Sequence, residues 1–392
     1  MNKISHHIFT FILITISLFT LNTQGIHAKN APNDSTNVQL PEAMTINMDS
    51  LLNEWKAQSY IFPDTTCTLP NFNPTYDTAV YIQRLSRIPA VMELPYNDIV
   101  RKYIDQYTNK QRSSVAYMLG AGNFYVPIFE EVLDKYGLPL ELKFLPVIES
   151  ALNPVAKSKV GATGLWQFML ATGQRYGLEV NSLVDDRCDP IKSSDAAARF
   201  LKDLYKIYGD WSLVIAAYNC GPGNVNKAIR RAGGVKDYWQ IYPYLPSETR
   251  GYVPAFIAAN YIMNYYCEHN ICPMSTKIPI ATDTVVVTRD VHIDQITAYC
   301  NIEKESIKSL NPQYKTNIIP GSSEPRVLRM TQQAILEFTE NEDSIYAYKA
   351  DELIKRRTTV VPKTTGSSTQ SSSQKKSSGS KYYKKSYSRR KR

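Results

Sequence analysis

The sequence lacks a membrane-spanning apolar run, a glycine-rich nucleotide-binding loop and a cluster of metal-binding residues. The apolar stretch Ile8–Leu21 has about 14 residues, whereas a membrane-spanning helix needs ~20. The composition also excludes a collagen, a coiled coil and a polytopic membrane protein. No two of the six cysteines have the spacing of a zinc knuckle, and the five histidines are scattered. We therefore predict neither a metal nor a cofactor.

The excess of positive charge lies at one end of the chain. The net charge is +9, and nine of the 45 Lys and Arg residues stand between Lys375 and Arg392, a segment that contains no acidic residue. The rest of the chain has 36 bases against 36 acids and is formally neutral. This distribution argues against a basic nucleic-acid groove in the folded part, and we predict no nucleic-acid partner.

The N-terminus is typical of a secretory signal peptide, which we place at residues 1–28. Lys3 precedes the apolar run, and small residues stand before Lys29. The alternative is an uncleaved N-terminal anchor; no cysteine follows the run, so a lipid-attachment signal is absent. An exported protein can form disulfides, and we expect Cys267 and Cys272 to pair.

The 392 residues, 43% of them apolar, are enough for two or three folded domains. Helical periodicity with Gly and Pro stops dominates the middle of the chain, and Asp189–Pro190 and Gly209 bound one helix, with Ala197, Phe200, Leu201, Leu204 and Tyr205 on its core face. After Asp283 the pattern becomes strand, helix, helix, strand. The expected segments after the signal are a helical or linker region (29–96) that includes a helix at Met48–Tyr60, a mainly helical domain (97–272), a small α+β module (283–331), a charged helical segment (332–361) and a disordered basic Ser/Lys-rich tail (362–392).

Glu149 is the strongest candidate for a general acid. It follows the apolar segment 140–148, which we expect to be helical up to a stop at Asn153 and Pro154. Apolar surroundings disfavour the charged form of a carboxyl group, so Glu149 can stay protonated near neutral pH. An isolated Glu near an apolar helix is more often a solvated or ion-paired residue.

Neighbouring features favour the catalytic interpretation. Gly161 and Gly164 permit a close backbone approach to a ligand, and the Gln167 amide can donate and accept hydrogen bonds. Tyr218 and Asn219 stand at a helix end before a glycine-rich turn. Glu248 and Tyr252, four residues apart, share one helical face.

Four ordered motifs between Glu149 and Val253 resemble the lytic transglycosylases of the soluble-transglycosylase, goose-lysozyme-like fold. They are Glu-Ser at 149, Gly-Leu-Trp-Gln-Phe-Met at 164, Ala-Tyr-Asn-x-Gly-x-Gly at 217 and Glu-Thr-Arg-x-Tyr-Val at 248. The resemblance implies a mainly α, lysozyme-like catalytic domain. It also implies non-hydrolytic cleavage of peptidoglycan strands between N-acetylmuramic acid and N-acetylglucosamine, leaving a 1,6-anhydro end.

By the same resemblance, Glu149 matches the single catalytic acid/base. The substrate's own N-acetyl group replaces a second carboxylate. The residues expected to bind the glycan or support the site are Ser150, Ser158, Gly164, Gln167, Met169, Tyr218, Asn219, Glu248 and Tyr252.

Two alternatives remain open. A hydrolytic muramidase on the same fold would need a second carboxylate, for which Asp185, Asp186 and Asp189 are candidates, although helix capping and turn formation suit these residues better. A non-catalytic wall-binding protein would bind the glycan without forming product.

The segment from Thr284 to Met330 resembles a LysM module, which binds glycans that contain N-acetylglucosamine. Arg289 and Thr331 depart from the family's usual Gly and Pro, and a degenerate spacer is the alternative. The basic tail could contact anionic wall peptides or phospholipid head groups. The matching positions include Val285, Val287, Asp290, Ile296, Tyr299, Ile307, Leu310, Asn311, Pro312, Ile319, Gly321, Leu328 and Met330.

Overall fold

The computed structural model describes residues 40–41, 61–276, 279 and 281–354. The predicted signal peptide, the helix expected at Met48–Tyr60 and the basic tail lie outside the described residues. The residues described belong to one unit of contacts. Within the described part, no helix combines the length and the apolar character that a membrane span requires.

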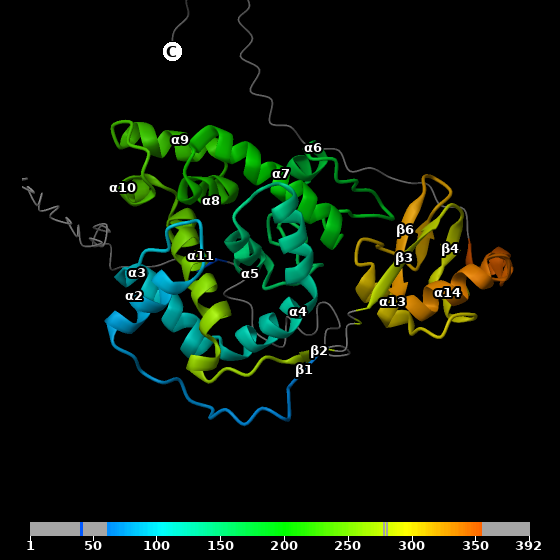
Figure 1. Ribbon diagram of the computed structural model, residues 1–392. Coiled ribbons are helices and arrows are strands. Elements are labelled where there is room, and N and C mark those ends of the chain that lie inside the picture. Colours follow the sequence, from blue (N-terminus) through cyan, green and yellow to red (C-terminus); the bar gives the residue numbers. More distant parts are fainter. Residues whose placement is uncertain (1–39, 42–60, 277–278, 280, 355–392) are drawn as a thin grey trace, which may run out of the picture. The chain divides into compact units, whose positions relative to one another are not determined.

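The domain expected at 97–272 is helical, as the sequence predicts (Figure 1). Its longest helix is α4, followed by α7 and α11, and the short helix α5 packs against α11. The α-helices of this part and its N-terminal extension are α2 (Thr78–Arg87), α3 (Asp98–Asp105), α4 (Arg112–Lys135), α5 (Leu145–Ser150), α6 (Leu170–Arg175), α7 (Pro190–Tyr208), α8 (Trp211–Cys220), α9 (Pro222–Arg231), α10 (Tyr238–Ile241) and α11 (Ser247–Tyr265). A π-turn, η3 (Gln106–Lys110), and the 3₁₀ turns η4 (Leu140–Phe144), η5 (Tyr242–Tyr244) and η6 (Cys267–His269) connect them.

Helix α7 begins and ends where the sequence predicts. The Asp189 side chain accepts hydrogen bonds from the backbone N–H groups of Ile191 and Lys192, and Gly209 adopts the left-handed conformation that closes the helix. Ala197, Leu201 and Leu204 are buried, and Phe200 is partly buried. Tyr205 was wrongly predicted to face the core: it is 39% exposed and stacks on Trp211, because it lies at the edge of the apolar stripe.

The expected Cys267–Cys272 pair is wrong, because Cys272 bonds to Cys67 instead. After η6 the chain turns at Asn270, whose φ is 52°, and then runs beside an earlier segment. Strand β1 (Ile61–Phe62) pairs with β2 (Ser275–Thr276) in antiparallel register, which brings the two cysteines together. Sequence proximity favoured the wrong partner because the pairing depends on this long-range contact.

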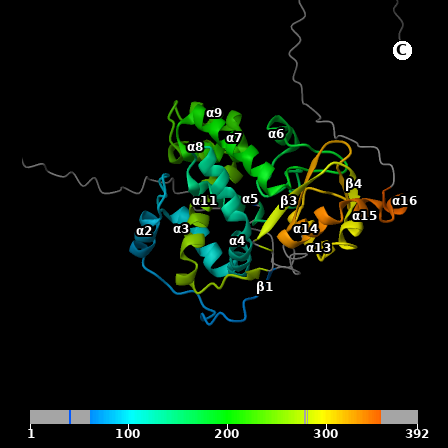
Figure 2. The same cartoon turned by 45° about the vertical axis from the view of Figure 1, so that its right-hand side comes forward.

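The second module has the expected strand, helix, helix, strand order (Figure 2). Strand β3 (Thr282–Val287) pairs antiparallel with β6 (Arg326–Thr331), so that Val285 lies opposite Leu328. The helices are α12 (Ile293–Thr297) and α13 (Lys304–Leu310). The sequence analysis missed a second short pair, β4 (Asp290–His292) with β5 (Ile318–Pro320), because three-residue strands carry almost no alternating pattern.

The core of this module extends past residue 331. Thr331 caps α14 (Gln332–Glu340) by accepting a hydrogen bond from the Ala334 N–H group, and Ile335 and Phe338 are buried with the sheet residues. Helices α15 (Glu342–Ala347) and α16 (Ala350–Leu353) follow. The charged helical segment expected from 332 therefore contributes apolar side chains to the core of the module.

Candidate active site

Glu149 lies in the last turn of α5, a helix with six residues. Instead of the single helix expected over 140–148, the chain forms the 3₁₀ turn η4 and then α5. The helix ends at Ser150, before Asn153 and Pro154, because Ala151 and Leu152 adopt left-handed backbone angles, with φ of 49° and 60°. This early end places Glu149 at the edge of the apolar core, partly exposed to solvent.

Burial raises the pKa of Glu149 to about 8. The hydroxyl of Tyr252 donates a hydrogen bond to its Oε1 atom and partly opposes this rise in pKa, whereas the nearby negative charge of Glu248 adds to it. A carboxyl group with this pKa is mostly protonated at neutral pH and can donate a proton.

The loop 156–168 follows α5 and is held by its own polar groups. The Ser158 hydroxyl accepts a hydrogen bond from the Ala162 N–H group at 3.0 Å. The Gln167 side-chain amide donates to the carbonyl oxygens of Ala156, at 3.2 Å, and Gly164, at 2.8 Å. Its amide nitrogen thus shapes the loop, while Met169, at the end of the loop, is 45% exposed and available to a ligand.

Two of the expected ligand contacts have structural roles instead. Gly164 does permit a close backbone approach, but the neighbour is the chain itself: a Cβ atom here would lie 1.8 Å from the carbonyl oxygen of Arg187. Ser150 has no exposed surface, and its hydroxyl lies within hydrogen-bond distance of the carbonyl oxygens of Pro146 and Leu165, to which its one proton can donate. A buried hydroxyl that joins α5 to the loop cannot touch a glycan in this conformation. Gly161, in contrast to Gly164, has open space where a Cβ atom would lie.

The two later motifs meet at Glu149. Tyr218, in the last turn of α8, donates to the carbonyl oxygen of Trp166 at 2.8 Å. Burial raises the Tyr218 pKa, and the Glu149 charge adds to this rise. Asn219 accepts a hydrogen bond from the Thr249 hydroxyl at 2.8 Å, a contact that the sequence analysis missed although Thr249 lies within the motif.

Glu248 and Tyr252, which we expected to share one helical face, both act on Glu149. Tyr252 is buried against Glu149. Glu248 is exposed at the start of α11, yet its charge raises the Glu149 pKa. Glu248 is therefore a second carboxylate, and its charge affects the pKa of Glu149.

Strained backbone concentrates at the site. Five non-glycine residues in the described part have positive φ values, and three of them, Ala151, Leu152 and Gln167, flank Glu149 or lie in the 156–168 loop. Such angles cost of order 1–3 kcal/mol per residue and persist where the surrounding structure imposes them, which is common at functional sites.

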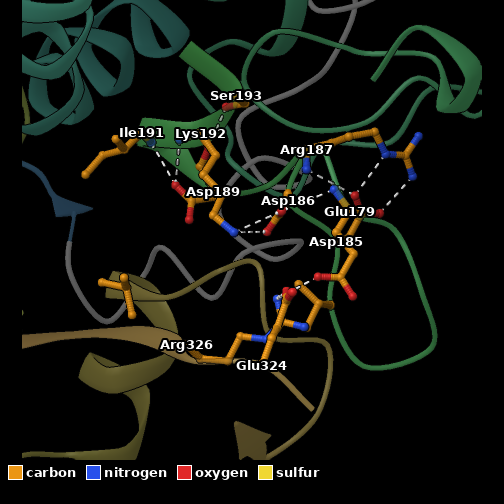
Figure 3. Close-up of polar contacts among 12 residues, drawn as sticks. Glu179, Asp185, Asp186, Arg187, Asp189, Ile191, Lys192, Ser193, Glu324 and Arg326 are labelled. Carbon is orange, nitrogen blue, oxygen red and sulfur yellow. Dashed lines mark hydrogen bonds and ion pairs between the residues drawn. The ribbon is translucent and has the colours of Figure 1, made fainter. Parts of the chain in front are cut away.

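The three aspartates considered as second carboxylates have other partners (Figure 3). Asp185 forms a two-pronged ion pair with Arg187, at 2.9 and 2.7 Å. Asp186 pairs with Lys192 at 3.0 Å, and Asp189 caps α7. The predicted capping role is confirmed for Asp189, and Asp185 also accepts a hydrogen bond from the Arg187 N–H group, as a turn residue does, whereas Asp186 serves in an ion pair.

Arg187 is a site residue that the sequence analysis missed. It is buried, and its Nη1 atom donates at 3.1 Å to the carbonyl oxygens of both Gly161 and Phe168, in and beside the 156–168 loop. An arginine within an aspartate-rich turn gives no sequence signal that separates this contact from a surface ion pair. Among the described residues no group of His, Cys, Asp and Glu side chains is arranged to hold a metal ion.

Comparisons with known proteins match both parts of the chain. Residues 127–241 match the family described as "Transglycosylase SLT domain", and residues 281–347 match "Lytic transglycosylase MltD, LysM-like domain". Membrane-bound lytic murein transglycosylase D of Escherichia coli K12 is 31% identical over 62% of this chain and 54% of its own length. Soluble lytic murein transglycosylase of the same strain is 33% identical over 30% of this chain and 19% of its own length.

The crystal structure of the 70 kDa soluble lytic transglycosylase from Escherichia coli aligns with a TM-score of 0.34 at 25% identity, over 44% of this chain and 32% of that one. The chain spans about half the length of lytic murein transglycosylase D.

The mainly helical part of the chain that contains Glu149 thus matches the model of a transglycosylase SLT domain. The second match is more specific. The segment that follows is similar to the LysM-like domain described for lytic transglycosylase MltD.

Proposed function

We propose that the chain is a peptidoglycan lytic transglycosylase. It cleaves the β-1,4 bond between N-acetylmuramic acid and N-acetylglucosamine without water and leaves a 1,6-anhydro end. The observation that carries this proposal is the Glu149 carboxyl group, partly buried at the end of α5, hydrogen-bonded to Tyr252 and with a pKa of about 8. One such group can serve first as an acid and then as a base.

In the first half of the reaction, protonated Glu149 donates its proton to the glycosidic oxygen, which leaves as the 4-hydroxyl of N-acetylglucosamine. The carbonyl oxygen of the muramic acid N-acetyl group attacks the anomeric carbon as that bond breaks. A pKa near the working pH suits this transfer. The group is protonated before the step, and it is still acidic enough to give up its proton.

In the second half, the Glu149 carboxylate accepts the proton of the sugar's 6-hydroxyl group. The oxygen of that group attacks the anomeric carbon and displaces the N-acetyl oxygen, which closes the 1,6-anhydro ring. Glu149 regains its proton and no water is consumed. The Tyr252 hydroxyl stabilises the carboxylate between the two halves, because its hydrogen bond favours the charged form.

Around this acid, the exposed Met169 and the partly exposed Ser158, Tyr218 and Asn219 provide glycan contacts. The LysM-like module adds glycan affinity, so peptidoglycan strands are the partner that we propose. A wall substrate and the expected signal peptide place the protein in the cell envelope.

Hydrolytic cleavage on the same fold is the second candidate, and Glu248 is the observation that favours it. The negative charge of this exposed carboxylate raises the Glu149 pKa. A muramidase would use it to activate water or to attack the anomeric carbon.

Digestion of purified sacculi by the full chain separates the candidates. A transglycosylase leaves anhydro ends, one water lighter by mass spectrometry than the reducing ends left by a muramidase. Glu149→Gln should lose at least about 100-fold in turnover because an amide cannot donate the proton, while glycan binding persists.

Glu248→Gln is the matched variant. It should retain most of the turnover and the anhydro product. Reducing ends that disappear with Glu248→Gln would establish the muramidase, and full activity in Glu149→Gln would refute both mechanisms. Sacculus binding without any product would leave a wall-binding protein.

A further inference from the structure

The segment between α6 and α7 connects the candidate active site to the LysM-like module. On the active-site side, Arg187 donates to the carbonyl oxygens of Gly161 and Phe168. The Arg187 carbonyl also lies so close to Gly164 that any side chain at 164 would collide with it. The loop 156–168 thus rests directly on Arg187.

On the other side, the same segment pairs with the backbone of the module. The Asp185 N–H group donates to the Gln313 carbonyl oxygen at 2.9 Å, and the Lys315 N–H group donates to the Leu183 carbonyl oxygen at 2.8 Å. Val184 and Tyr314 form an antiparallel bridge between these two hydrogen bonds. Lys315 also donates from its Nζ atom to the carbonyl oxygen of residue 181 at 3.0 Å.

Ion pairs of the buried Arg326 side chain reinforce this backbone pairing. Arg326, on β6, is 4% exposed and pairs with Glu179 at 2.6 Å and with Glu324 at 2.5 Å (Figure 3). Asp186 accepts a hydrogen bond from the Glu179 N–H group, which holds the glutamate within the segment. Loss of the Glu179 contact is costly because the Arg326 charge is buried and then has less compensation.

We propose that the LysM-like module positions the loop that binds the glycan. Residues 313–315 and Arg326 hold the segment 179–187, and Arg187, a positioning residue, holds the loop 156–168. The role of that loop in glycan binding rests on the proposed function. The mechanical link does not, because its contacts lie within the chain and need no ligand.

Hydrogen–deuterium exchange of the full chain, without substrate, tests the link. Arg326→Glu places three carboxylates together and should open the contact with Glu179. We expect amides of both 179–187 and 156–168 to exchange about tenfold faster, since local opening sets these rates. Lys304→Glu is the matched control: it makes the same charge change in the same module but breaks an ion pair with Asp294 inside it. It should leave both segments unchanged.

A charge swap distinguishes loss of this ion pair from misfolding of the variant. Glu179→Arg alone should also loosen both segments, and the double variant Glu179→Arg/Arg326→Glu should restore their protection. On sacculi, the single variants should raise KM by about five-fold with kcat changed by less than about twofold, as expected when substrate positioning is weakened.

Faster exchange in 179–187 with an unchanged 156–168 loop would overturn the proposal, as would unchanged exchange in both segments. Failure of the proposed function looks different: the exchange results would hold, while sacculi would yield no anhydro product.

Discussion

At the scale of single residues, the Tyr252–Glu149 hydrogen bond helps to determine the pKa of the proposed acid. The bond lowers the pKa that burial raises, so Tyr252→Phe should raise the Glu149 pKa further above about 8. The high-pH limb of kcat/KM should then move to higher pH, and turnover should fall about tenfold, because the carboxylate formed during the reaction loses its donor. A pH–rate profile on sacculi measures both effects.

Tyr261→Phe is the control for this change. Tyr261 lies on the same helix and is buried, but its hydroxyl contacts Arg84 and His269 instead of Glu149. Its pH profile should match that of the unmodified chain. If the Tyr252→Phe profile also matches that of the unmodified chain, the hydrogen bond does not influence the Glu149 pKa.

The raised pKa of Glu149 also affects folding stability. Between the unfolded pKa, near 4.5, and about 8, the folded chain holds a proton that the unfolded chain has lost, so stability falls as pH rises. Glu149→Gln cannot lose a proton and should escape this cost. By pH 8 the variant should be more stable by roughly 1–3 kcal/mol, a value reduced for partial solvent contact.

Urea unfolding of both proteins from pH 4 to pH 9 measures the difference. Near pH 4 the two should have similar pH dependence, and the advantage of the variant should grow as the pH approaches 8. An advantage that does not change with pH would contradict a proton held by Glu149 in the folded state.

Sequence motifs point to Glu149 as the candidate acid because the proposed chemistry needs one carboxyl group in apolar surroundings. They mislead at Ser150, since a small hydroxyl beside the acid suits both glycan binding and internal hydrogen bonding, and only its complete burial decides between them. The partners of Asn219 and Tyr252 come from other helices, so their distances to Thr249 and Glu149 depend on packing.

At the scale of elements, the loop 156–168 depends on two glycines in different ways. Gly164→Ala forces a side chain into the Arg187 carbonyl at a φ of 86°, and we expect a loss of roughly 3 kcal/mol or more. Gly161→Ala has a similar φ, 87°, but open space, so only the left-handed strain of about 1–2 kcal/mol applies. Equal losses in urea unfolding would contradict the packing argument.

Elements with local signals follow from the sequence, and those without them do not. The ends of α7 are set by Asp189 and Gly209, which cap it from within a few residues. The end of α5 was misplaced because Ala151 and Leu152 carry no left-handed preference and are held there by their surroundings. Strands β4 and β5 are too short to show the alternation of apolar and polar residues that marks a strand.

At the scale of the whole molecule, contacts between distant segments were beyond prediction from sequence. Cys67 and Cys272 are separated by 205 residues, and their pairing follows from β1 meeting β2. The link from the module to Arg187 likewise joins residues more than 100 positions apart, and no motif marks it. The order of the two domains, in contrast, follows from their separate patterns.

The basic segment from Lys375 gives a prediction for the full chain. The segment contains nine Lys and Arg residues and no acidic residue, whereas the rest of the chain is formally neutral, so electrostatic attraction to anionic wall peptides or head groups should depend on this segment. A chain that ends at Val361 should bind purified sacculi with little salt dependence. The full chain should lose retention by about tenfold or more between about 50 and 500 mM salt, because screening shortens the reach of its charges.

A third chain, with the nine Lys and Arg residues replaced by Gln, keeps the length of the segment and removes its charge. It should behave like the shortened chain, because length alone supplies no long-range attraction. If the Gln-substituted chain keeps the salt response of the full chain, the attraction comes from another surface. If all three chains share one salt profile, the tail makes no electrostatic contact with the wall.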